Sequence, residues 1–240
     1  METKKENTTK TRVYNIIILD KSGSMNSIRK EAVDGCNETI ASIRAAQKRH
    51  QDTQEHYISL AAFCGCGIDM IYDKTPIDEA QELTWDKYSP CCMTPLFDAI
   101  GMTAKSMETY TKSIAEFVDT AVLVTIITDG YENASREWTA PAIKKLIEEC
   151  KEEGWMFSFI GAGEEVLNVA TTISITNTVL WKQTSEGTKE IFDNENKARD
   201  RFFDSMAMCY CCEAAPMERK EMKKRFAEKY YKKDKEDWEL

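Results

Sequence analysis

Residues 13–25 read VYNIIILDKSGSM, an almost unbroken apolar run that ends in Asp20 and leads into a turn rich in serine. β-branched residues dominate the run, which is typical of a parallel strand covered by helices on both faces. Residues 121–129, AVLVTIITD, repeat this pattern and again end in an aspartate, Asp129. The two runs therefore predict a sheet whose central strands are buried on both sides.

Weaker patterns extend this sheet and surround it with helices. Further strands are predicted at residues 57–63, 68–72, 155–160 and 174–181. Apolar residues at spacings of three and four predict helices within residues 25–43, 96–117, 143–150 and 191–206. A glycine-rich gap at residues 64–67 predicts a hairpin, so the strand after it is expected at an antiparallel edge. Because strands and helices alternate, we expect a Rossmann-like, doubly wound α/β sheet that is mostly parallel, with helices on both faces.

The composition is that of an ordinary globular chain of 240 residues, with 42% hydrophobic and 30% charged residues. We expect one domain at residues 13–212, including an added C-terminal helix, between a polar segment at 1–12 and a solvated, charged tail at 213–240. A formal net charge of −9 argues against nucleic-acid binding, which usually needs a basic surface. The first apolar run is too short for a membrane span or a secretory signal, so we expect a cytoplasmic protein without membrane attachment.

Hard oxygen donors follow the first buried strand. Asp20, Ser22 and Ser24 offer one carboxylate and two hydroxyls within a single turn, and such donors suit Mg²⁺. Ligands of open α/β sheets bind beyond the carboxyl ends of the strands, where Asp20 and Asp129 meet if their strands are neighbours. Thr94 stands before a proline at a predicted helix start, where it is expected to be the N-cap residue and offers a further hydroxyl. The sequence thus predicts a magnesium site at this edge.

These motifs together resemble the von Willebrand factor type A domain and its metal-ion-dependent adhesion site. The site of that family contains Asp-x-Ser-x-Ser after the first strand, a later threonine and an Asp-Gly after the fourth strand. The matching residues here are Asp20, Ser22, Ser24, Thr94 and Asp129, and the order of strands and helices agrees over residues 13–181. Residues 129–138, DGYENASREW, resemble the stand-alone bacterial members of the family.

The resemblance implies one bound Mg²⁺ or Mn²⁺, held by the hydroxyls directly and by the aspartates partly through water. It also implies an open coordination position that a Glu or Asp of a partner protein fills. We therefore expect a metal-dependent protein-binding module without catalytic residues. The identity of the partner and the oligomeric state are not predicted.

A metal-dependent hydrolase that acts on a phosphoester or nucleotide stays open as an alternative. A bound cation activates water, but hydrolysis usually needs a positioned base as well. Glu132, close to Asp129, is a candidate for that base. The chain has two histidines; we expect His50 to be solvated at a helix end and His56 to be structural. An EF-hand beginning at Asp20 is excluded because Met25 stands where the loop requires glycine.

The nine cysteines support another alternative, a thiol-rich zinc or redox protein. Seven of them form three clusters: Cys64-Gly-Cys66, Cys91-Cys92 and Cys209-Tyr-Cys211-Cys212. The first two clusters are expected at the same sheet edge as the magnesium site. Neither Cys-x-Cys nor Cys-Cys has the usual Cys-x-x-Cys spacing of zinc ligands, and an odd count does not suit a complete set of disulfides. We therefore expect free thiols that do not bind zinc tightly.

Overall fold

The apolar run at the start of the chain forms β1 (Thr11–Asp20), which lies inside a six-stranded sheet in the order β3-β2-β1-β4-β5-β6. The computed structural model describes residues 10–211 and 215–232. The other strands are β2 (Gln54–Cys64), β3 (Gly67–Pro76), β4 (Thr120–Thr128), β5 (Met156–Gly161) and β6 (Asn177–Leu180). β3 pairs antiparallel with β2, and all other neighbours are parallel. The predicted fold class, a mostly parallel α/β sheet with one antiparallel edge strand, is confirmed.

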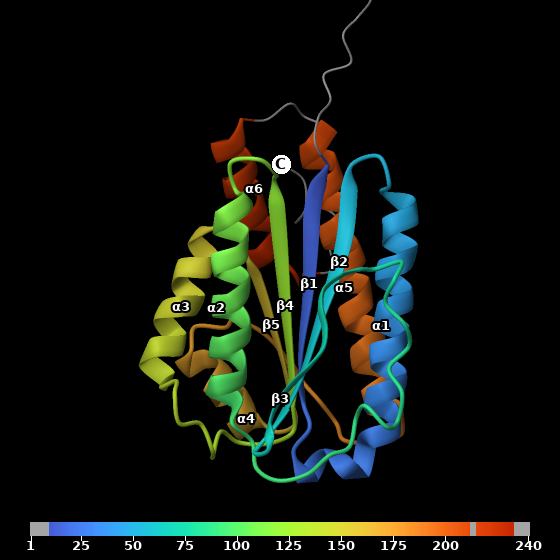
Figure 1. Cartoon of the computed structure of the whole chain (residues 1–240), viewed down its shortest axis with the longest axis vertical. Coiled ribbons are helices and arrows are strands. Elements are labelled where there is room, and N and C mark those ends of the chain that lie inside the picture. The colour runs from blue at the N-terminus through green and yellow to red at the C-terminus, as the bar shows by residue number, and fades with distance from the viewer. Residues whose placement is uncertain (1–9, 212–214, 233–240) are drawn as a thin grey trace, which may run out of the picture.

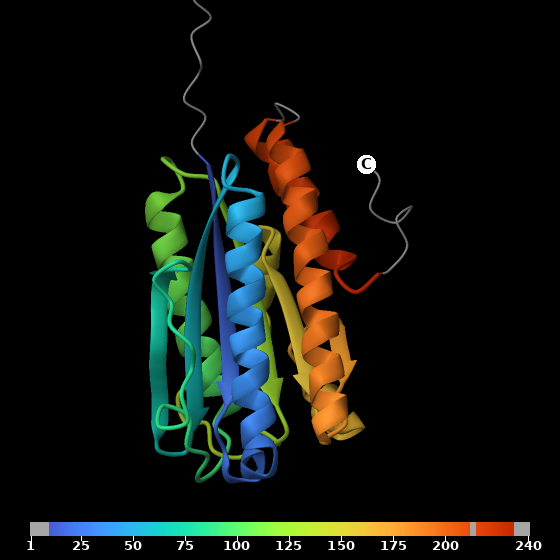
Figure 2. The same ribbon diagram turned by 90° about the vertical axis from the view of Figure 1, so that its right-hand side faces the viewer.

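Helices cover both faces of this sheet (Figures 1 and 2). They are the 3-10 helix η1 (Gly23–Ile28) and the α-helices α1 (Arg29–Arg49), α2 (Leu96–Ile114), α3 (Ala140–Glu152), α4 (Glu164–Thr172), α5 (Ser185–Cys211) and α6 (Pro216–Glu228). Side chains of β1 alternate between two apolar clusters, as the period of a strand requires. Val13 and Ile17 join the cluster with α1, α5 and α6, whereas Tyr14 and Ile18 join the one with α2, α3 and α4.

The pattern of the sequence does not predict α4, because only two of its nine residues, Val166 and Ala170, are buried. Such a short helix leaves too few apolar positions for a periodic signal. The strand expected at residues 174–181 is reduced to the four residues of β6. Among the helices of the described ranges, none is both long and apolar enough to cross a membrane.

The described part of the charged tail packs against the domain and is not solvated as expected. Phe226 of α6 and Tyr230, just after that helix, are 4% and 0% exposed and lie in the same apolar cluster as Phe202 of α5. Lys223 is also buried and donates a 2.8 Å hydrogen bond to the carbonyl of Thr120. The surrounding charged residues hide this short apolar stripe in the sequence.

A buried polar cluster joins α5 to the sheet and to the chain after α6. Glu195, which is 2% exposed, forms an ion pair of 3.2 Å with Arg199, which is 1% exposed. The same carboxylate oxygen accepts hydrogen bonds of 2.8 Å from Thr125 and 2.9 Å from Tyr230, and the other oxygen accepts one of 2.6 Å from Tyr231. These partners compensate for the cost of burying the charges.

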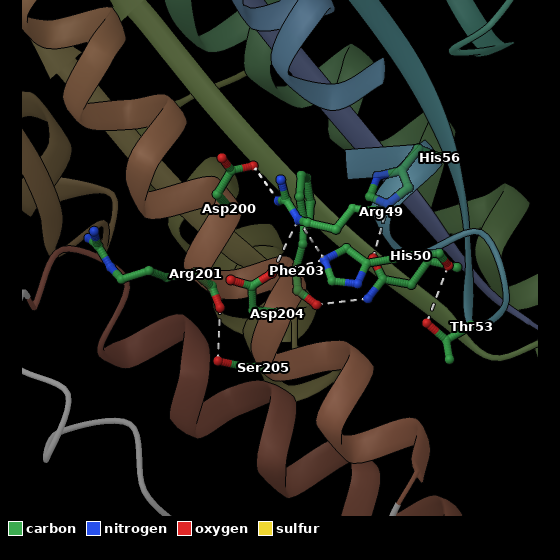
Figure 3. A network of polar contacts seen from close by, with 10 residues as sticks. Arg49, His50, Thr53, His56, Asp200, Arg201, Phe203, Asp204 and Ser205 are labelled. Carbon is green, nitrogen blue, oxygen red and sulfur yellow. Dashed lines mark hydrogen bonds and ion pairs between the residues drawn. The ribbon is translucent and has the colours of Figure 1, made fainter. Parts of the chain in front are cut away.

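The end of α1 is attached to α5 through charged side chains, as Figure 3 shows. Arg49 donates a 3.0 Å hydrogen bond to Asp200, and Nε2 of His50 lies 2.9 Å from Asp204. The His50 side chain is 12% exposed, so the expectation of a solvated histidine is wrong. His56 packs edge-on against Phe203 with 4.5 Å between the ring centroids, which suits the structural role expected of it.

Candidate metal centre

The two strands that end in aspartates are direct neighbours in the sheet. β1 and β4 run parallel, with Leu19 level with Ile127. Asp20 and Asp129 therefore lie at the same end of the sheet, where the carboxyl ends of the two strands meet. The helix after β1 belongs to one apolar cluster and the helix after β4 to the other. The chain order therefore reverses between these strands, which is where open α/β sheets bind ligands.

Hydrogen bonds connect the predicted donors of the two strand ends. The buried Asp20 accepts one bond of 2.6 Å from the backbone N–H of Ser22 and another of 2.6 Å from the hydroxyl of Thr128. The hydroxyls of Ser22 and Ser24 lie 3.1 Å apart, and Ser24 donates to Asp129 Oδ1 at 2.7 Å. Ser24 is exposed and Asp129 half-buried, so the group opens toward solvent.

Thr94 lies against the same group, although it comes from the long loop before α2. A methyl group placed on Gly130 would come within 2.7 Å of the Thr94 hydroxyl oxygen and 3.5 Å of Asp20 Oδ2. The missing side chain of Gly130 thus leaves the space into which the Thr94 hydroxyl and the Asp20 carboxylate both project. The structure brings together all five residues predicted from the sequence, Asp20, Ser22, Ser24, Thr94 and Asp129.

Thr94 is not the N-cap residue of α2, contrary to expectation. The N-cap is Pro95, without a side-chain cap hydrogen bond, and the helix begins at Leu96. Because Pro95 occupies the N-cap position, Thr94 lies one residue ahead of the position from which a side chain caps α2. Asn133 instead holds the backbone of Thr94, because its side-chain oxygen accepts from Thr94 N–H at 2.9 Å and its own N–H donates to the Thr94 carbonyl at 3.2 Å.

The start of α2 receives its caps from the loop after β4. Glu132 accepts hydrogen bonds of 2.8 Å from Phe97 N–H and of 2.7 Å from the hydroxyl of Ser135. In the reverse direction, Asp98 of α2 accepts a 2.8 Å bond from the N–H of Trp138. Glu132 therefore holds the loop after β4 to the first turn of α2, which does not suit the role of a catalytic base. Asn133 and Asp98 were not singled out by spacing, since their partners lie far away in the sequence.

Gln183, in the connection from β6 to α5, is a further neighbour that the sequence does not reveal. Its side-chain amide donates a 2.6 Å hydrogen bond to Asp129 Oδ2. Asp129 thus accepts from Ser24 on one oxygen and from Gln183 on the other. The loop that leads into α5 is in this way attached directly to the candidate site.

The electrostatics of the site favour a cation. Burial raises the pKa of Asp20 to about 6, the hydrogen bonds from Thr128 and Ser22 oppose the shift, and the charge of Asp129 adds to it. Burial also raises the pKa of Asp129. Lys21, between the site residues in sequence, forms its ion pair with Asp69 instead. Two desolvated carboxylates next to neutral hydroxyls form an all-oxygen donor set that fits Mg²⁺ or Mn²⁺.

Neither histidine lies at this edge of the sheet. His56 is level with Val13 near the start of β1, and His50 follows the end of α1. Neither histidine is near the site, and Glu132 is already held by its hydrogen bonds. Among the described residues, the site therefore consists of hydroxyls and carboxylates suited to binding. These oxygen atoms could hold a cation on the side that opens toward solvent.

Comparisons with known proteins identify the fold. No family model matches the chain, and no curated protein matches it in sequence. A solved structure described as von Willebrand factor type A from Catenulispora acidiphila matches with a TM-score of 0.50 at 15% identity, over 78% of this chain and 42% of that one. The pilus adhesin SpaC from Lactobacillus rhamnosus GG, in its open conformation, matches with a TM-score of 0.53 at 11% identity, over 82% of this chain and 31% of that one. The chain has a von Willebrand factor type A-like fold, and it spans less than half the length of these matched structures.

Proposed function

We propose that the protein is a metal-dependent protein-binding module that captures a carboxylate of its partner. Asp20, Ser22, Ser24, Thr94 and Asp129 would hold one Mg²⁺ or Mn²⁺. The observation that carries this proposal is the convergence of two carboxylates and three hydroxyls, from three separate loops, at the strand edge where the chain order reverses.

The charge of this donor set explains why the ligand would be an anion. Two carboxylates carry at most two negative charges, and the three hydroxyls fill coordination positions without adding charge. When bound, a divalent cation supplies Lewis acidity toward an incoming anion at an exchangeable position. Because Ser24 is exposed, a Glu or Asp side chain of a partner can reach this side of the site.

Two observations are consistent with binding without catalysis, and we propose that the protein works in the cytoplasm. The base candidate that the sequence indicates in this loop, Glu132, is held by backbone and hydroxyl donors. SpaC, which shares the fold, is described as a pilus adhesin, and a binding role for this chain agrees with that description. We expect stand-alone bacterial proteins of this type to be its relatives.

Metal binding is tested first and without a partner. Isothermal titration with Mg²⁺, and water-proton relaxation with Mn²⁺, are carried out on the wild type, on Asp129→Ala and on the control Asp34→Asn. Asp34 is an exposed aspartate of α1 that pairs with Lys30. We expect one site in the wild type and the control and none in Asp129→Ala. Equal binding in all three proteins would refute the assignment.

Partner binding is tested next by affinity capture from bacterial extract with Mg²⁺ or EDTA. The affinity of the captured protein is then measured for the wild type, for Thr94→Ala and for Thr109→Ala, which removes an exposed hydroxyl from α2. Losing one side of a desolvated charged contact commonly costs on the order of 2–5 kcal/mol. We expect that loss in EDTA and a smaller one with Thr94→Ala, which removes a neutral ligand of the cation, whereas Thr109→Ala binds like the wild type. A partner that binds equally under all conditions would show that the site does not serve binding.

A further inference from the structure

Four cysteines converge beside the candidate metal centre. Cys64 ends β2 and Cys66 stands in the turn to β3, while Cys91 and Cys92 belong to the loop before α2. The Sγ atoms of Cys64 and Cys91 lie 3.5 Å apart, those of Cys66 and Cys91 3.8 Å, and those of Cys66 and Cys92 3.0 Å. Cys64, Cys66 and Cys91 form a group whose sulfur atoms all lie within 4.8 Å of one another.

Backbone hydrogen bonds hold the two cysteine-bearing loops together. Gly65 N–H donates to the Met93 carbonyl at 2.8 Å, and Cys91 N–H donates to the Lys21 carbonyl at 2.9 Å. A methyl group on Gly65 would lie 3.1 Å from Met93 N and 3.2 Å from Cys92 Cβ, so glycine permits this close approach. Cys92 itself adopts the left-handed region with φ of 61°. The sulfur atoms are therefore brought together by the backbone of both loops.

The sulfur distances suit thiolates around one metal ion. Zinc–sulfur bonds are about 2.3 Å long, and tetrahedral geometry then places ligand sulfurs about 3.8 Å apart. The distances of 3.5 Å and 3.8 Å around Cys91 are close to this value. The sulfur atoms of Cys66 and Cys92 lie only 3.0 Å apart, so the exposed Cys92 would have to turn away from Cys66 to join the other three as a ligand. A disulfide would need about 2.05 Å between two sulfurs and would leave the other two thiols without a role.

We propose that Cys64, Cys66, Cys91 and Cys92 bind one Zn²⁺ as thiolates, at a site separate from the oxygen site of Asp20 and Asp129. Thiolate sulfur selects zinc over magnesium, just as the oxygen donors select magnesium. Each thiol loses one proton to solvent when it binds the cation, so binding becomes tighter as the pH rises. Neither of these two cysteine pairs has Cys-x-x-Cys spacing, but the four ligands come as two pairs from loops that fold together.

The surroundings give a cation access to the cluster. Hydrogen bonds from the thiols of Cys92 and Cys91 lower the pKa of Cys66, and the positive charge of Lys21 contributes to the shift, whereas the hydrogen bond with Cys64 raises the pKa of Cys91 to about 12. Cys64 is buried, while Cys66 and Cys92 are exposed, so the cluster has a closed base and an open side. A zinc ion there would fix the β2–β3 turn to the loop that carries Thr94.

The test uses the full chain, purified under reducing conditions and without added metal chelator. Zinc content is measured by elemental analysis, zinc affinity by competition with a chromogenic chelator, and sulfur ligation by the visible absorption of the Co²⁺-substituted protein. The variants are Cys66→Ser and Cys92→Ser, whose side chains are exposed, and the control is Cys150→Ala, a cysteine of α3 outside the cluster. Asp129→Ala separates this site from the oxygen site.

We expect one zinc per chain in the wild type, in Cys150→Ala and in Asp129→Ala, together with the absorption of tetrahedral cobalt thiolate. Affinity should fall at least about tenfold in Cys66→Ser and in Cys92→Ser, and zinc should raise the unfolding temperature of the wild type more than theirs. The proposal is overturned if the reduced wild type holds no stoichiometric zinc. It is equally overturned if both serine variants bind zinc like the wild type, or if peptide mapping of protein from unreduced cells shows a Cys66–Cys92 disulfide.

Discussion

The hydroxyl of Ser24 donates a 2.7 Å hydrogen bond to Asp129, a residue 105 positions further along the chain. This bond joins the turn after β1 to the turn after β4 and brings the second carboxylate of the site toward Asp20. Both carboxylates have a raised pKa because they are buried. Without a cation, the ionised forms of these two carboxylates therefore lower the free energy of unfolding.

Asp20→Asn is expected to stabilise the protein in EDTA and to abolish its stabilisation by Mg²⁺. The pKa of Asp20 is about 6 in the folded protein against 3.8 ordinarily, so folding favours the protonated form. This favourable contribution to the stability is present below about pH 3.8 and is lost as the pH rises through 6. The loss reaches about 3 kcal/mol at pH 7. Asparagine removes the charge, and the hydroxyl of Thr128 can turn its donor toward the Gly130 carbonyl, 3.2 Å away.

Urea unfolding at pH 7, in EDTA and in Mg²⁺, measures this effect. The control Asp34→Asn should show the Mg²⁺ response of the wild type. If Asp20→Asn were less stable than the wild type in EDTA, the desolvation argument would be wrong. If it were stabilised by Mg²⁺ as strongly as the wild type, Asp20 would not be a ligand.

Asn133→Ala is expected to weaken Mg²⁺ binding about tenfold, although Asn133 belongs to no predicted ligand set. The variant loses the 2.9 Å hydrogen bond that holds the backbone of Thr94, so the threonine hydroxyl is less well placed. Asn133→Asp keeps an acceptor at the same position and should restore the affinity. Titration calorimetry of both variants, with Asn168→Ala of α4 as control, checks this. Equal affinities in Asn133→Ala and the wild type would contradict a positioning role.

His56 should make the protein less stable in mild acid. Burial, with smaller contributions from the charges of His50 and Arg49, lowers its pKa to about 3. The unfolded chain takes up a proton near pH 6.5, whereas the folded protein does not. The stability that neutral His56 contributes is therefore present above pH 6.5 and is lost progressively as the pH falls toward 3. Between pH 6.5 and 5 the loss is about 2 kcal/mol, at 1.36 kcal/mol per pH unit.

The comparison that isolates this effect is the pH dependence of urea unfolding in the wild type and in His56→Gln. Glutamine carries no titrating group, so the difference in stability between the two proteins should shrink as the pH falls from 6.5 to 5. A constant difference over that range would mean that His56 is protonated in the folded protein. Asp20 contributes to the pH dependence of stability with the opposite sign. It is present in both proteins, so its contribution cancels in their difference.

Glu195→Ala is expected to destabilise the protein by roughly 3–5 kcal/mol, because it leaves the charge of Arg199 buried without its partner. The double variant Glu195→Leu, Arg199→Met removes both charges and should recover most of this loss. Glu190→Ala, an exposed position of the same helix, is the control and should change stability by less than about 0.5 kcal/mol. Denaturant unfolding decides the matter: a double variant as unstable as Glu195→Ala would show that the lost hydroxyl contacts dominate.

The central strands and the candidate site were open to prediction because their signals are local. The apolar run before Asp20 and the similar run before Asp129 indicate strand ends, and parallel pairing brings such ends to one edge. Capping and loop contacts were not predictable, since they join residues far apart. Spacing alone does not show that Glu132 binds α2, or that Gln183 reaches Asp129 from the loop before α5.

The same distinction explains the tail and the cysteines. Phe226 and Tyr230 are two apolar residues among many charged ones, and only the neighbouring α5 gives them a surface to pack against. Cys64-Gly-Cys66 and Cys91-Cys92 each have the wrong spacing for a zinc motif when taken alone. Their proximity arises from the pairing of two loops, which no periodicity in the sequence encodes.

The direction of β1 has a practical consequence for how the protein can be displayed. Thr11 begins this strand at the edge opposite to Asp20 (Figure 1), and ten extended residues separate the two edges by roughly 30 Å. A surface or bead attached ahead of Thr11 therefore lies behind the molecule, while the turns after β1 and β4 face outward. Anchored in this orientation, the protein leaves the oxygen site unobstructed even for a large partner.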